Sequence, residues 1–221
     1  MADTQADSAH ASAEIPHGAT INIPDIRIGA GGEPLALGAS VFMVGALTFG
    51  MAFTGVFPAG ATGAAVPVAI FTSGLALFLT ALWGLFRGET VLSAIFGTVA
   101  GLFVSFGVLL LGLYHNWFAI PAASAPSAEA IFFIAFACWF ALLLVPSVKL
   151  PLLYTIAISA VVASLSLAAA GELAAKPGLL QTAGAGFLVV SFCLALLLTN
   201  ANTTAVGMKP WPPLGKPLRG E

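Results

Sequence analysis

The chain alternates between long uncharged apolar runs and short polar segments. The clearest run extends from Arg87 to Trp117, where no acidic or basic side chain follows Glu89 before the aromatic cluster that ends at Trp117. An α-helix rises about 1.5 Å per residue, so about 20 apolar residues cross a hydrocarbon core of roughly 30 Å. This pattern predicts a transmembrane helix over residues 90–113.

Five other runs have the same character, and each is bounded by proline, glycine or charged residues. The predicted spans are residues 35–57, 64–86, 90–113, 129–148, 152–170 and 179–200. The expected fold is therefore an all-α integral membrane protein with six transmembrane helices. Its transmembrane domain, residues 34–200, follows a polar N-terminal tail of residues 1–33 and precedes a basic, proline-rich tail of residues 201–221.

The basic residues indicate the orientation of the chain. Six spans place both termini on one side of the membrane, and six of the seven basic residues then fall on that side, the exception being Lys176. The six are Arg27, Arg87, Lys149, Lys209, Lys216 and Arg219. Because lysine and arginine are enriched in cytoplasmic segments, we expect both termini in the cytoplasm.

Small residues in the third span predict a packing surface. Gly97 and Gly101 lie four positions apart, with Ala94 before them and Ser105 after them. Such spacing forms a groove that lets a second helix approach to backbone contact in lipid. In the N-terminal tail, Ile21–Ile28 alternates apolar and polar residues, which fits either a disordered tail or an extended clasp on a neighbouring subunit.

Composition excludes a soluble protein. Charged residues make up 7% of the chain and the mean hydropathy is +1.04, whereas a soluble domain has about 25% charged residues. The net charge of −2 gives no reason to expect a nucleic-acid partner. Cys138 and Cys193 both lie in apolar runs, so we interpret them as buried packing residues.

The predicted spans lack the groups that most membrane chemistry requires. No acidic, basic or histidine side chain lies well inside a span, which argues against a proton pump and against a haem held by histidine. No cluster of histidine, cysteine or carboxylate has ligand spacing, so we expect no catalytic site, metal or cofactor. The spans do carry serine and threonine, most of which hydrogen-bond helix backbones but which together fit a narrow uncharged pore.

Several motifs resemble the acetate uptake transporter family, which includes the bacterial succinate–acetate permease and its fungal relatives. The resemblance covers most of residues 31–215 and is clearest at Glu33–Leu37 and at Gly88–Thr90 followed by Phe96, with a weaker part at Pro213–Gly215. It implies a homo-hexamer of six-helix protomers in the bacterial cytoplasmic membrane, each with an hourglass-shaped path for small monocarboxylates such as acetate, or for succinate.

The resemblance also implies which residues form the path. Pro34, Leu35 and Leu37 would shape its entrance. The narrowest point would lie among Ser40, Phe42, Phe96, Val99 and Val161. Here the chain departs from the family, since Ser40, Val99 and Val161 align with an aromatic residue, a tyrosine and a leucine.

Three functions remain open on the sequence alone. The first is a passive or weakly proton-coupled channel for acetate-like monocarboxylates. The second is a pore for a neutral solute such as urea, an amide or ammonia, because no cation inside a span offsets the lost hydration of an anion. The third is a non-conducting accessory subunit, which binds lipid and unrelated membrane subunits.

Overall fold

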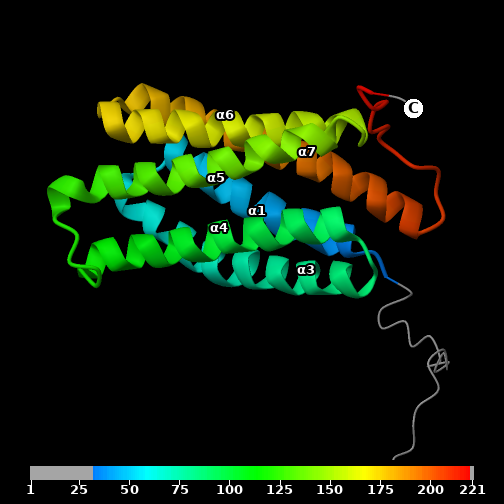
Figure 1. Cartoon of the computed structure of the whole chain (residues 1–221), viewed down its shortest axis with the longest axis horizontal. Helices are drawn as coiled ribbons and strands as arrows, with labels where there is room; N and C mark the ends of the chain where they lie inside the picture. The colour runs from blue at the N-terminus through cyan, green and yellow to red at the C-terminus, as the bar shows by residue number, and fades with distance from the viewer. Residues whose placement is uncertain (1–31, 220–221) are drawn as a thin grey trace, which may run out of the picture.

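The computed structural model describes residues 32–219, and within that range the chain is helical with no strand (Figure 1). The predicted N-terminal segment Ile21–Ile28 lies outside the described residues. The elements are α1 (Pro34–Thr54), η1 (Ala59–Ala64), α2 (Ala65–Pro67), η2 (Val68–Leu75), α3 (Ala76–Phe86), α4 (Thr90–His115), η3 (Ala122–Ser124), α5 (Ala125–Ser147), α6 (Leu152–Ala174) and α7 (Pro177–Ala205).

Six helices in this part of the chain are long and apolar enough to cross a membrane, which confirms the predicted number. The second of them, Ala59–Phe86, is continuous but changes its winding, with a π-helical segment at η2. Large apolar side chains such as Phe71, Leu142 and Phe192 are more than 60% exposed on the outside of the bundle. A soluble monomer rarely exposes such patches, whereas lipid accommodates them. The protein is therefore a multi-pass membrane protein.

The helix boundaries differ from the predicted spans at positions where a glycine or a proline sets the start or the end of a helix. Helix α1 ends at Thr54 because Gly55 adopts a left-handed conformation with φ 70°. Helix α5 begins at Ala125, four residues before the predicted start, because Pro126 fits a first helical turn. As a consequence Glu129 lies inside this helix. Helix α6 continues to Ala174, which also brings Glu172 inside a helix.

The helices pack around α1 (Figure 1). Helix α7 lies along α1, α6 lies between α5 and α7, and α3 with η2 packs against both α1 and α4. Both described ends of the chain lie at one end of the bundle, which we call the terminal end. The opposite end, with the connections α1–η1, α4–η3 and α6–α7, is the far end.

Close helix contact occurs at different glycines from those predicted. A Cβ at Gly184 of α7 would lie 2.6 Å from the backbone nitrogen of Thr54 and 2.9 Å from the carbonyl oxygen of Gly50, both in the α1 segment. A Cβ at Gly97 would lie 3.6 Å from Ala81, an ordinary contact, and one at Gly101 would meet nothing. Neither glycine is therefore a point of backbone contact between helices of the described chain, and their role in packing against another helix stays a prediction. Gly101 is exposed on the outside of the bundle, whereas Gly97 is half-buried against α3.

The C-terminal tail folds back over the terminal end. Beyond α7 it has no regular structure, as its prolines predict, but it is held by hydrogen bonds. The Leu153 N–H donates to the Leu214 carbonyl at 3.0 Å, and the Arg219 N–H donates to the Val148 carbonyl at 3.1 Å. The Leu214 side chain also packs on the hydrophobic core. The tail is thus part of the folded domain.

We expect removal of residues 208–221 to lower the melting temperature of the detergent-solubilised protein by several degrees. The truncation deletes the tail's hydrogen bonds, each of which contributes on the order of 1 kcal/mol, together with the Leu214 contacts. Hydrogen exchange at the Leu153 amide should become faster at the same time. Removal of residues 220–221 alone is the control, and equal melting of the two truncated proteins would contradict the prediction.

Candidate functional site

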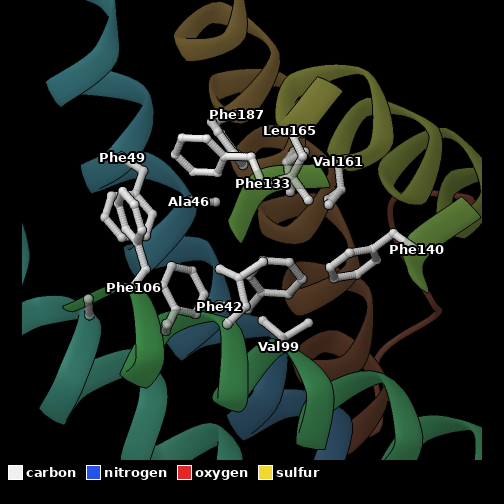
Figure 2. Packing of buried hydrophobic residues seen from close by; sticks show 14 of the residues in the cluster. Phe42, Ala46, Phe49, Val99, Phe106, Phe133, Phe140, Val161, Leu165 and Phe187 are labelled. Atoms are coloured by element: carbon white, nitrogen blue, oxygen red, sulfur yellow. The ribbon is translucent and has the colours of Figure 1, made fainter. Parts of the chain in front are cut away.

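Three of the predicted path residues meet in the centre of the bundle. Phe42 of α1, Val99 of α4 and Val161 of α6 belong to one contiguous cluster of buried side chains (Figure 2). Phe140 of α5 lies beside them, so that four helices each contribute one side chain. We call Phe42, Val99, Phe140 and Val161 the constriction, after the role that the resemblance predicts for Phe42, Val99 and Val161; that role stays a prediction.

The constriction is closed in this conformation. Val99 and Phe140 are 1% exposed, Val161 is 4% exposed and Phe42 is 9% exposed. A water-sized probe therefore hardly reaches these side chains from either end. All four are apolar, so the closed layer has no group that would hydrogen-bond a solute or hold a charge.

An aromatic layer adjoins the constriction on its far-end side. The rings of Phe49 and Phe103 stack at 5.2 Å, and Phe106 meets Phe49 edge-on at 5.3 Å. Phe53 and Phe133 are also edge-on, with centroids 6.0 Å apart. Edge-to-face and offset pairs at these separations attract one another beyond their area of contact. This packing keeps the layer dry.

Two hollows lead from the far end toward the aromatic layer. The larger, which we call the mouth hollow, has a volume of about 530 Å³ and is lined by α4, the α4–α5 connection and the start of α5. The smaller, which we call the deep hollow, has a volume of about 180 Å³ and ends on Phe49, Phe53 and Phe106. Tyr114 and Glu129 line both hollows, which are therefore neighbours.

A third hollow of about 430 Å³ opens at the terminal end. It is lined by residues 88–92 together with Ile95, Leu150 and Tyr154. Glu89, one of these lining residues, forms an ion pair with Arg87 at 2.8 Å. None of the residues that line the mouth hollow, the deep hollow or this hollow is a lysine, arginine or histidine.

The other predicted path residues lie near the terminal end. Pro34 is buried at the first turn of α1, and Leu35 packs against the core. Leu37 is 38% exposed and so faces away from the core. The Ser40 hydroxyl donates to the Leu37 carbonyl at 2.7 Å, so it is already used within its own helix. Ser40 and Leu37 therefore lie apart from the constriction.

Phe96 is buried in the same cluster but occupies a separate position. It is 3% exposed, and its ring packs directly against Gly38 of α1, where a side chain would collide with it. Phe96 lies one helical turn before Val99 on α4, which places it on the terminal-end side of the constriction. The structure thus gathers four predicted residues in one buried cluster: Phe96, Val99, Phe42 and Val161.

Buried hydroxyl groups hold helices together. The Ser73 hydroxyl of η2 donates to the Val41 carbonyl of α1 at 2.8 Å, and the Ser191 hydroxyl of α7 donates to the Met43 carbonyl at 3.2 Å. Thr80 and Ser164 donate to carbonyls in their own helices. Among the described residues, these four hydroxyls are thus used by backbone carbonyls and stabilise the helices and their contacts, whereas the buried Ser93 hydroxyl has no partner there.

Sequence reasoning missed two parts of the site. The aromatic layer and Phe140 were not selected because phenylalanine is common in every span, although Phe49 and Phe53 recur at the four-residue spacing of one helix face. Glu129 is the first residue of the predicted span 129–148, so the sequence predicts it at a helix end. Two preceding prolines, Pro121 and Pro126, are the signal that places the helix start earlier.

The comparisons with known proteins bear on the family and on the fold. Residues 22–206 match the model of the GPR1/FUN34/yaaH family, which covers most of the chain. Among solved structures, the bacterial acetate channel SatP superposes with a TM-score of 0.73 over 82% of this chain and 98% of that one. Its sequence is 16% identical, so this likeness shows a shared fold. Among curated proteins, none matches. By the extent of the family match, the chain belongs to the GPR1/FUN34/yaaH family.

Proposed function

We propose that this protein is a membrane channel or transporter for small monocarboxylates such as acetate, and that it acts passively or with weak proton coupling. The observation that carries the proposal is the buried apolar constriction at the centre of the bundle, together with a hollow at each end of the bundle. We propose that the hollows at the two ends are the entrances of a path that the constriction closes. Such a constriction controls passage by its width and by dewetting.

The relatives support the choice of solute. The family match and the shared fold with an acetate channel favour acetate over larger metabolites. Apolar side chains at the constriction suit a methyl group, and the absence of basic lining residues argues against tight binding of a dicarboxylate such as succinate. We further propose the bacterial cytoplasmic membrane as the location, with both termini in the cytoplasm.

A homo-hexamer is part of the same proposal. On one face of α4, Gly101 and Ser105 are exposed, and among the described residues a Cβ at Gly101 would meet nothing within 4 Å. Small residues on a lipid-facing helix permit close packing with a second protomer. This face is therefore where we expect neighbouring subunits to pack.

The experiment that tests the function is a flux panel in liposomes. We expect reconstituted protein to admit labelled acetate faster than protein-free liposomes of the same lipid, at a pH well above the acid's own pKa. Acetamide and urea in parallel assays separate a monocarboxylate path from a neutral-solute pore. Uptake equal to that of protein-free liposomes for all three solutes would contradict conduction.

The closed constriction also favours a second candidate, a non-conducting accessory subunit of a larger membrane complex. Its side chains are no more exposed than those of an ordinary core. Purification in mild detergent distinguishes the two candidates. A complex of this chain alone supports the transporter, and stable co-purification of unrelated subunits, together with absent flux, supports the accessory role.

A further inference from the structure

Glu129 occupies the one position in the described chain where a carboxylate lines both far-end hollows. It lies in the second turn of α5 and is half-buried. The deep hollow continues from it to the rings of Phe49, Phe53 and Phe106. Any solute that reaches the aromatic layer through these hollows therefore passes this carboxylate.

No partner neutralises Glu129 within the described residues. Its carboxylate makes no hydrogen bond and no ion pair there. The group that acts on it electrostatically is Glu172 of α6, which has the same sign. The nearest basic residue in sequence at this end, Lys176, is exposed in the α6–α7 turn and lines neither hollow, and His115 stacks on Trp117.

The remaining polar groups of the hollows do not compensate an anion either. Apart from Glu129, the polar side chains in the lining are Tyr114 and Asn116 in the mouth hollow and Tyr114 and Thr62 in the deep hollow, all uncharged. The Thr62 hydroxyl already donates to the Ala59 carbonyl at 2.7 Å. A half-buried charge interacts with its neighbours more strongly than one in bulk water, because the effective dielectric constant is lower. An anion in these hollows is repelled, whereas a neutral solute can donate a hydrogen bond to the carboxylate.

We propose that the Glu129 carboxylate acts as a charge filter in the far-end hollows: it disfavours anions relative to uncharged solutes, so the protonated form of a monocarboxylic acid enters these hollows more readily than its anion. The effect of Glu129 on transport rests on the proposed function. The effect of Glu129 on which molecules enter the hollows does not, so it can be tested without measuring transport.

The test measures how fast a thiol in the hollow reacts with an anionic and with a neutral reagent. Ala125 lines the mouth hollow and lies four residues before Glu129, on the same helix face. Cys138 is exposed, so the prediction that it is a buried packing residue is wrong, whereas Cys193 is buried as predicted. In a background with Cys138→Ala and Cys193→Ala, Ala125→Cys provides a single thiol. The reagents are sulfonatoethyl methanethiosulfonate, an anion, and methyl methanethiosulfonate, which is neutral.

We expect Glu129→Gln to raise the ratio of the anionic to the neutral reaction rate by about three- to tenfold, because the substitution removes the negative charge that repels the anionic reagent. Dividing by the rate with the neutral reagent cancels any change in access to the thiol. Glu172→Gln is the matched control, since Glu172 lies at the same end but lines neither hollow. It should change the ratio by less than half as much on a logarithmic scale. An unchanged ratio in Glu129→Gln, or an equal change in both variants, would overturn the proposal.

The same variants in the flux assay keep the two proposals separate. If the rate ratio changes but no variant conducts acetate or acetamide, the charge filter stands and the proposed function fails. If the wild-type protein conducts but Glu129→Gln leaves the rate ratio unchanged, the charge filter fails and the proposed function stands. Where both hold, Glu129→Gln should raise acetate flux relative to acetamide flux by a similar factor.

Discussion

Replacement of Gly184 with leucine is expected to prevent the recovery of folded protein. At this position α7 touches the backbone of α1, since a Cβ would lie 2.6 Å from the Thr54 nitrogen and 2.9 Å from the Gly50 oxygen. Backbone atoms inside a helix cannot rotate away as a flexible side chain does. Even alanine should lower the free energy of unfolding by about 1–3 kcal/mol, the usual cost of overpacking.

The measurement is the yield of monodisperse protein in size-exclusion chromatography, with the melting temperature of the alanine variant. Gly178 provides the matched control in the same helix, because a Cβ there meets nothing within 4 Å. Gly178→Ala and Gly178→Leu should therefore be recovered as well as the wild type. Normal yield and melting of Gly184→Leu would show that α1 and α7 do not touch in this way.

The contrast between Gly184 and Gly101 shows what a sequence motif conveys. Small residues four apart on an apolar helix indicate that close approach is permitted, and Gly97 with Gly101 meet that condition. The motif does not state which helix approaches or from which chain. Gly50 and Gly184 are far apart in sequence, so only the packing of α1 on α7 relates them.

The number and type of helices were predictable because length and hydropathy alone decide them. A run of about 20 uncharged apolar residues has few alternatives in lipid, where backbone groups must be satisfied internally. Boundaries were less predictable. Gly55 ends α1 and Pro126 helps to start α5 through the backbone conformation of a single residue. Because α5 starts four residues earlier than predicted, Glu129 lies inside the helix and lines two hollows.

Residues of the candidate site could be predicted only where the family resemblance indicated them. Val99 and Val161 are ordinary core residues by composition, and hydrophobicity is nearly uniform around every helix, so no periodic pattern selects them. The resemblance named them, and they lie together in the core. Whether they line a path of permeation stays a prediction, which the flux of variants can test.

Shortening the side chains of the constriction is the most direct test of whether they line a path of permeation. Phe42→Ala removes the side chain that α1 contributes to the constriction, including its edge-on contact with Phe103, whose ring centroid lies 5.9 Å away. We expect acetate flux through liposomes to rise by about tenfold or more, which corresponds to a barrier lowered by about 1.4 kcal/mol. Val99→Ala should raise flux in the same direction by a smaller factor, because it removes less volume.

Stability changes must be separated from changes in the path, since a buried Phe→Ala substitution costs about 3–5 kcal/mol in soluble cores. Leu197→Ala truncates a side chain that is 2% exposed in the same cluster but belongs to α7, outside the constriction. It should lower the melting temperature without raising flux. If Phe42→Ala and Val99→Ala remain folded and admit no more acetate than Leu197→Ala, the centre of the bundle is a structural core, and the accessory-subunit candidate then accounts better for its closed packing.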